Sequence, residues 1–157
     1  MSTRSGGPVP PARSEMGGQR TGIQGTFPPV ERESPRIVID VLVVDDQPVF
    51  REVLRDVVAA TPGMRLAGEA ASGEEAVAAV EALAPALVLM DKRMPGMGGI
   101  AAARAIRQRH PGTAVILVSV EDPDPELAEK SGALGFLPKG QLSPRALAGL
   151  WSAHAGG

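Results

Sequence analysis

The 157-residue sequence lacks several features that would assign a protein to a class at once. It has no cysteine, which excludes a disulfide framework and a thiolate metal site. Sixteen Lys and Arg stand against 18 Asp and Glu, and only 3% of the residues are aromatic, so no basic, aromatic-rich patch points to nucleic acid. No apolar run approaches the roughly 18 residues of a membrane span, and no secretory signal opens the chain. We therefore expect a cytoplasmic protein that makes no contact with a membrane.

Two regions differ in composition. Residues 1–36 hold six Gly and six Pro and show no apolar periodicity, which predicts a disordered N-terminal extension. Residues 37–157 alternate between apolar and polar segments and are long enough to bury a core. We expect a single folded domain over this second region.

The folded region reads as strands that alternate with helices. Short apolar or β-branched runs predict strands, and runs with apolar residues at helical spacing, opened by Pro or by a Ser-x-x-Glu capping box, predict helices. The alternation predicts an α/β fold with a parallel sheet and right-handed crossovers. The expected strands are 37–44, 64–70, 87–90, 114–120 and 135–137, and the expected helices are 48–60, 72–83, 98–109, 122–131 and 143–151.

The stretch Leu87 to Gly99 is the most informative. Four apolar residues end at one carboxylate, Asp91, and a Pro and three Gly follow within eight positions. A wholly apolar run of this kind predicts a strand that is buried on both faces. A carboxylate at the carboxyl end of such a strand lies where open α/β sheets bind their ligands, although an Asp that only stabilises a turn is the plain alternative.

Other polar residues end the other strands at the same edge. Asp45 and Asp46 end the first strand, Ser119 ends the fourth and Lys139 follows the fifth. If the first and third strands are neighbours, three carboxylates with Asp91 meet in one cleft, where they repel each other unless a cation is present. Mg²⁺ is the natural cation for such a set, and a lysine and a hydroxyl suit a phosphoryl group. The alternatives are that the two Asp only cap the first helix and that Ser119 is an ordinary strand-end hydroxyl.

These residues resemble the receiver domain of bacterial two-component response regulators. The resemblance covers residues 37 to about 151 and implies a flavodoxin-like, doubly wound, five-stranded parallel sheet with the strand order 2-1-3-4-5. It rests on Val-Val-Asp45-Asp46-Gln-Pro, Leu-Met-Asp91-Lys-Arg-Met-Pro-Gly-Met-Gly-Gly, Ile-Leu-Val-Ser119 and Gly-Ala-Leu-Gly-Phe136-Leu-Pro-Lys139.

The resemblance also implies roles for the residues. Asp91 would accept a phosphoryl group from a sensor histidine kinase or a phosphotransfer protein. Mg²⁺ would be bound by Asp46, Asp91 and the backbone carbonyl of Arg93, with Asp45 helping through water. Lys139 would contact the phosphoryl group, and Ser119 and Phe136 would form the conformational switch, although Phe136 is also compatible with a plain core role.

The sequence departs from the family's usual pattern near the acceptor. Lys92 follows Asp91 where an apolar residue is commoner, and Val120 follows Ser119 where Ala or Gly is usual. Arg93 and Glu121 should flank the mouth of the site with opposite charges and, with Val120, restrict the access of water. We therefore expect a long-lived phosphoryl group.

We expect no output domain, because nothing after Gly157 could be a DNA-binding helix-turn-helix. We expect a stand-alone receiver that catalyses only its own phosphorylation and dephosphorylation. It is expected to act through a downstream protein partner and to bind no DNA directly. The sequence does not decide whether it forms a homodimer. Two alternatives remain. The first is a degenerate receiver that binds proteins independently of phosphorylation, and the second is a hydrolase with an aspartyl nucleophile, which needs an Asp-x-Asp motif that Asp45-Asp46-Gln47 does not supply.

Overall fold

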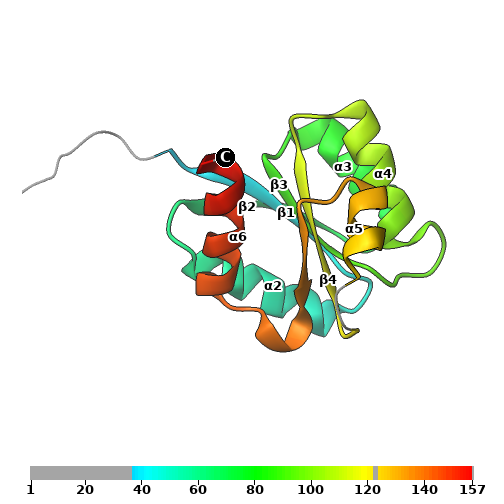
Figure 1. The fold of residues 1–157 in the computed structure, drawn as a ribbon. Helices are drawn as coiled ribbons and strands as arrows, with labels where there is room; N and C mark the ends of the chain where they lie inside the picture. The colour runs from blue at the N-terminus through cyan, green and yellow to red at the C-terminus, as the bar shows by residue number, and fades with distance from the viewer. Residues whose placement is uncertain (1–36, 122–123, 157) are drawn as a thin grey trace, which may run out of the picture. The chain divides into compact units, whose positions relative to one another are not determined.

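The computed structural model describes residues 37–121 and 124–156, so the expected disorder of residues 1–36 lies outside the described residues. Strands and helices alternate along this part of the chain, as predicted (Figure 1). The strands are β1 (Ile39–Val44), β2 (Met64–Ala70), β3 (Leu87–Asp91), β4 (Ala114–Ser119) and β5 (Gly135–Pro138). The helices are α2 (Pro48–Ala60), α3 (Gly73–Leu83), α4 (Gly98–Arg109), α5 (Pro125–Ser131) and α6 (Pro144–Gly156), with a short 3-10 helix η2 (Lys139–Gln141) between β5 and α6.

All five strands run parallel, in the order β2-β1-β3-β4-β5, which confirms the predicted topology. The register pairs Val44 of β1 with Met90 of β3, and Asp91 of β3 with Val118 of β4. The residue after Val44 and the last residue of β3 are therefore brought to the same carboxyl edge of the sheet.

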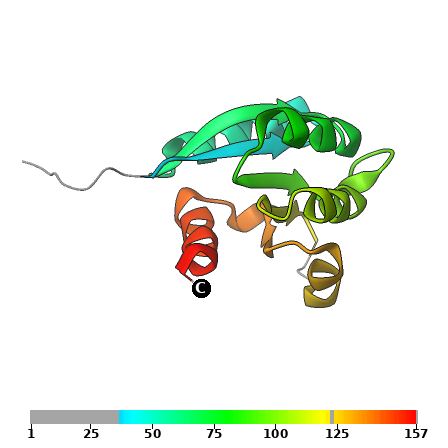
Figure 2. The same cartoon turned by 90° about the horizontal axis from the view of Figure 1, so that it is seen from above.

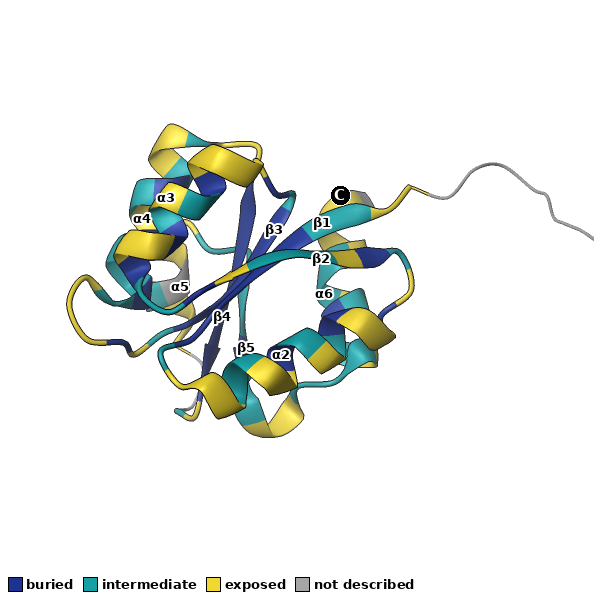
Figure 3. Ribbon diagram, turned by 180° about the vertical axis from the view of Figure 1, so that it is seen from behind, coloured by how far each residue is buried: buried dark blue, intermediate teal, exposed yellow. Residues whose placement is uncertain are grey.

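Helices cover both faces of the sheet, with α2 and α6 on one side and α3, α4 and α5 on the other (Figures 1 and 2). Alternate residues of the central strands supply two separate cores, because successive side chains of a strand point to opposite faces. Figure 3 shows β3 and β4 as buried and the outer surfaces of the helices as exposed. The core under α2 and α6 includes Leu54, Val58, Leu89, Ile116 and Leu147, and the core under α3 and α4 includes Val80, Val88, Met90, Ile106 and Leu117.

The predicted boundaries hold within a few residues. Pro48 opens α2, and Ser72 caps α3 by accepting a hydrogen bond from the backbone N–H of Glu75 at 3.1 Å. β1 begins at Ile39 instead of Ile37, because its pairing with β2 begins there. The last helix continues to Gly156 instead of ending near Trp151, because no helix-breaking residue intervenes.

The loop from β3 to α4 depends on glycine. A Cβ atom on Gly99 would lie 2.1 Å from the backbone oxygen of Asp91, so no other residue fits at this position without a shift of the backbone. Gly96 and Gly98 adopt φ angles of +79° and +77°, a conformation that favours glycine. The three glycines let α4 begin directly against the end of β3 and keep Asp91 at the edge of the sheet. Among the helices of residues 37–121 and 124–156, none combines the length and the apolar character that crossing a membrane requires.

Candidate functional site

Three carboxylates converge at the carboxyl edge of the sheet. One carboxylate oxygen from each of Asp45, Asp46 and Asp91 lies within 4.8 Å of the other two. Asp45 is fully buried, Asp91 is 6% exposed and Asp46 is half-buried. The convergence follows from the parallel pairing of β1 with β3, and three hard oxygen donors at this spacing suit a divalent cation such as Mg²⁺.

Lys139, the first residue of η2, brings a positive charge to the carboxylates. Its Nζ lies 3.2 Å from Oδ2 of Asp45 and 3.5 Å from Oδ1 of Asp91. The same Nζ lies 4.0 Å from the centroid of the Phe50 ring, a cation–π contact. The ammonium thus compensates two buried carboxylates, which would otherwise be costly to ionise.

The environment raises the pKa of Asp91 above its ordinary value. Burial of the carboxyl group is the largest cause and the charge of Asp45 is the next. The ammonium of Lys139 and the backbone N–H of Arg93 act in the opposite direction, without cancelling the rise. Burial therefore disfavours the ionised form of Asp91, and an additional cation would stabilise that form.

The buried Asp45 is held in place by residues at and just before the start of α2. The backbone N–H of Gln47 donates to Oδ1 of Asp45 at 2.9 Å, and Nη1 of Arg51 donates to the backbone oxygen of Asp45 at 2.7 Å. Asp45 therefore binds the backbone of Gln47, the N-cap residue, but it does not cap α2, because no side chain of the described residues makes a capping hydrogen bond there. Its other carboxylate oxygen faces Lys139.

Ser119 and Phe136 lie on neighbouring strands, because β4 pairs with β5. Ser119 is 2% exposed, and its Oγ accepts a hydrogen bond from the backbone N–H of Glu121 at 3.0 Å. Phe136 is half-buried and packs against the core under α3 and α4. The structure thus places both residues beside the carboxylate edge, and their switching role stays a prediction.

Two of the residues expected to control access, Arg93 and Glu121, contact each other. Arg93 contacts Glu121 through Nη2 and through Nε, the latter at 2.8 Å from Oε2. The guanidinium of Arg93 and, secondly, the ammonium of Lys92 lower the pKa of Glu121 below its usual value. Val120 is 77% exposed, and the effect of all three residues on the access of water stays a prediction.

Three residues at the site were not assigned a role from the sequence. Phe50 and Arg51 lie in the first turns of α2 and contact Lys139 and Asp45, respectively. Lys92 donates to Oε1 of Glu121 at 2.5 Å. Its charge directly after Asp91, where an apolar residue is commoner, was the feature of the sequence that could have indicated a role for it.

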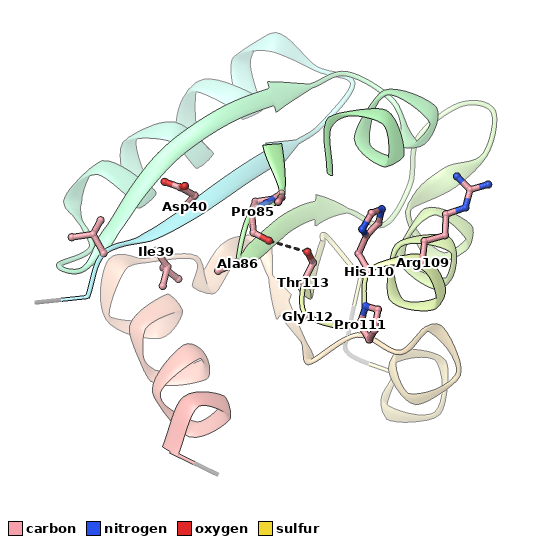
Figure 4. A pocket seen from close by; sticks show the side chains of 11 residues that line it. Ile39, Asp40, Pro85, Ala86, Arg109, His110, Pro111, Gly112 and Thr113 are labelled. Carbon is pink, nitrogen blue, oxygen red and sulfur yellow. Dashed lines mark hydrogen bonds between the residues drawn. The ribbon is translucent and has the colours of Figure 1, made fainter. Parts of the chain in front are cut away.

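A separate pocket of about 680 Å³ lies at the opposite end of the sheet (Figure 4). It is lined by residues at the amino ends of β1, β3 and β4, among them Asp40, Ala86 and Thr113. Oγ1 of Thr113 donates to the backbone oxygen of Pro85 at 2.8 Å there, which ties the loops before β3 and β4 together. None of the three clustered carboxylates lines this pocket, so it is separate from the site described above.

Comparison with known proteins identifies the family. Residues 41–148 match the model of the response regulator receiver domain. The chain is 42% identical over 105 residues to the response regulator GacA of Pseudomonas protegens, an alignment that covers 66% of this chain and 49% of GacA. The response regulator domain of Thermotoga maritima CheB superposes with a TM-score of 0.66 at 35% identity, covering 74% of this chain and 96% of that structure.

The expectation that the protein binds no DNA directly is wrong. A two-component response regulator of the LuxR family from Aurantimonas superposes with a TM-score of 0.68 at 30% identity, covering 74% of this chain and 84% of that one. A DNA-binding response regulator of the LuxR family from Staphylococcus aureus, at 21% identity, shares the fold. The chain spans about half the length of the curated relatives that it matches. The missing helix-turn-helix of the sequence analysis therefore has no bearing on DNA binding, because only the receiver region is compared.

Receiver domains act in phosphorelay signalling through the phosphorylation of an aspartate, and they bind Mg²⁺ at an acidic pocket. They are generally signalling modules without an enzymatic activity toward other substrates. The cluster of Asp45, Asp46 and Asp91 provides an acidic site of this kind. On the match over residues 41–148 and the identity to GacA, this chain belongs to the response regulator receiver domain family.

Proposed function

We propose that this protein receives a phosphoryl group on Asp91 from the phosphohistidine of a kinase or phosphotransfer protein. In this step a carboxylate oxygen of Asp91 forms a bond to phosphorus, the phosphorus–nitrogen bond breaks, and the imidazole nitrogen leaves with the electron pair. The observation that carries the proposal is the convergence of Asp91 with two further carboxylates and the ammonium of Lys139. Lys139 would bind a phosphoryl oxygen through a charge-assisted hydrogen bond.

We also propose that Mg²⁺ is the cation of this site. The fit rests on the donor set, which is three carboxylates, two of them in contact with the ammonium of Lys139, and on the raised pKa of Asp91. Asp46, Asp91 and the backbone carbonyl of Arg93 would hold the ion, and Asp45 would contribute through water. The ion would neutralise the charge on the phosphoryl oxygens as they approach the carboxylates.

Ser119 and Phe136 would report the phosphorylation. Ser119 lies at the carboxyl end of β4, next to β5, and its hydroxyl is the donor suited to a phosphoryl oxygen. A turn of Ser119 toward the phosphoryl group would leave space for Phe136 to move inward, which makes a two-state element biased by local charge. The protein would catalyse only its own phosphorylation and dephosphorylation. The receiver domain would span residues 37–157, and the protein would be located in the cytoplasm.

The experiment is to incubate the protein with Mg²⁺ and phosphoramidate and to measure its intact mass. We expect one phosphoryl adduct on the wild type and none on Asp91→Asn, while Asp56→Asn, an exposed residue of α2 outside the site, should be labelled like the wild type. Full labelling of Asp91→Asn would refute the assignment. No adduct on any protein would favour the degenerate receiver, and rapid multiple turnover would favour a hydrolase.

A further inference from the structure

We propose that Lys92 is a positioning residue that acts through Glu121 to hold Ser119 and Phe136 in the conformation of the unphosphorylated protein. The proposal rests on the function proposed above. It assigns a role to the charged residue directly after Asp91, where the sequence departs from the usual apolar residue of the family.

Lys92 is fixed at both its backbone and its side chain. Its backbone N–H donates to the oxygen of Val118 at 2.9 Å, and its own oxygen accepts from the N–H of Gly99 at 3.0 Å. Its side chain is only 14% exposed, and its Nζ lies 2.5 Å from Oε1 of Glu121. The same Nζ lies 5.7 Å from the centroid of the Phe136 ring. Lys92 therefore joins the loop after β3, the loop after β4, and β5.

Glu121 transmits this contact to Ser119. Its carboxylate is bound by Lys92, while its backbone N–H donates to Oγ of Ser119 at 3.0 Å. Arg93 also binds this carboxylate, but its side chain is 70% exposed, and exposed ion pairs contribute little. Lys92, the more buried of the two cations, thus restrains Glu121 together with Arg93, and the backbone N–H of Glu121 in turn binds the hydroxyl of Ser119.

The pair of Lys92 and Glu121 acts on the switch and not directly on the phosphoryl group. Met90 points into the core under α3 and α4, against which Phe136 packs, and the ammonium of Lys92 lies beside the ring of Phe136. The ammonium that contacts Asp91 is that of Lys139, at 3.5 Å.

Phosphorylation has to work against this pair. For its hydroxyl to turn toward a phosphoryl oxygen on Asp91, Ser119 must give up the hydrogen bond from Glu121, and movement of Phe136 must displace the ammonium above its ring. A contact that exists only in one of two conformations shifts the equilibrium toward that conformation. The Lys92–Glu121 pair should therefore reduce the fraction of molecules in the conformation that binds a phosphoryl mimic. The apparent affinity for the mimic should fall by the same factor.

The test is to titrate the protein with beryllofluoride in the presence of Mg²⁺ and to follow the backbone amide of Ser119 and the ring of Phe136 by NMR. We expect Lys92→Met, which keeps the apolar stem, to bind the mimic about three- to tenfold more tightly than the wild type. Glu121→Gln should have a similar effect, and the double variant should gain no more than either single variant, because both remove the same contact. Lys130→Met, which removes an exposed cation paired only loosely with Glu126 at 4.0 Å, is the matched control and should bind as the wild type does.

Unchanged or weaker binding in Lys92→Met would overturn the proposal, and so would independent, additive effects of the two substitutions. If Lys92→Met does not fold, Glu121→Gln alone and Lys92→Arg decide: the first should bind more tightly, and the second, which keeps the charge, should bind like the wild type. Failure of the wild type to bind the mimic at all would instead refute the proposed function, so the two failures are distinguishable.

Discussion

Asp91→Asn should stabilise the folded protein in the absence of divalent cations, at the same time as it abolishes phosphorylation. The substitution keeps the shape of the side chain and removes one charge from a cluster of three carboxylates, two of which contact the ammonium of Lys139. The free energy of unfolding should therefore rise at neutral pH.

The distances give the magnitude. With an effective dielectric constant of about 20, two unit charges at 4.8 Å, the upper limit of the spacing between these carboxylate oxygens, repel by about 3.5 kcal/mol, and opposite charges 3.5 Å apart attract by about 5 kcal/mol. Two carboxylates oppose the charge of Asp91 and Lys139 supports it, which leaves a net penalty of about 2 kcal/mol before the cost of burial. Because Asp46 is half-buried and screened by water, we expect Asp91→Asn to gain about 1–2 kcal/mol.

The pH dependence has a definite sign. The pKa of Asp91 is raised in the folded state, so its ionisation costs stability above that pKa, and the cost disappears as the pH falls below the pKa of the unfolded chain. The advantage of Asp91→Asn should accordingly be full at pH 7 and shrink as the pH is lowered. Excess Mg²⁺ should also reduce it, because the ion stabilises the charged wild type by binding to the folded state.

The assay is urea unfolding followed by the fluorescence of Trp151, the sole tryptophan, which packs against the core under α2 and α6. Wild type, Asp91→Asn and the exposed control Asp56→Asn are compared with a chelator and with excess Mg²⁺. The control should change little under either condition. A less stable Asp91→Asn in chelator, or equal stabilisation of wild type and variant by Mg²⁺, would refute the reasoning.

Three further predictions concern the same edge of the sheet. Asp46→Asn should weaken Mg²⁺ binding by roughly tenfold or more, measured by Mg²⁺-dependent NMR shifts, because a hard cation requires anionic oxygen; equal affinity would contradict this. Lys139→Ala should still be labelled by phosphoramidate but fail to change conformation, so an NMR spectrum identical to that of the phosphorylated wild type would show that the coupling role is wrong. Arg93→Ala, Glu121→Ala and Val120→Ala should each lose the phosphoryl group faster, by up to about tenfold for about 1.4 kcal/mol of barrier, with less-than-additive effects for the charged pair. Unchanged decay across that set would exclude control of access by these residues.

The elements could be predicted because their causes are local. Pro48 opens α2 through its fixed backbone angle, and Ser72 caps α3 through its side chain. The continuous apolar run before Asp91 is typical of a strand covered on both faces. Once the strands are parallel, residues at their carboxyl ends must lie at one edge, so the gathering of Asp45, Asp91 and Lys139 was predictable. The neighbouring placement of β1 and β3 came from the resemblance to receivers.

The tertiary structure alone decided which side chains meet. The position of Lys139 over Phe50 and the binding of Arg51 to the oxygen of Asp45 depend on how α2 packs on the sheet, which no local pattern specifies. The contact of Lys92 with Glu121 joins two loops that are 29 residues apart, and it depends on the β3–β4 register and on the rotamer of a long side chain. The sequence by itself thus determined the elements and the chemistry available at the edge of the sheet, whereas the packing of helices and loops decided how those charges are paired.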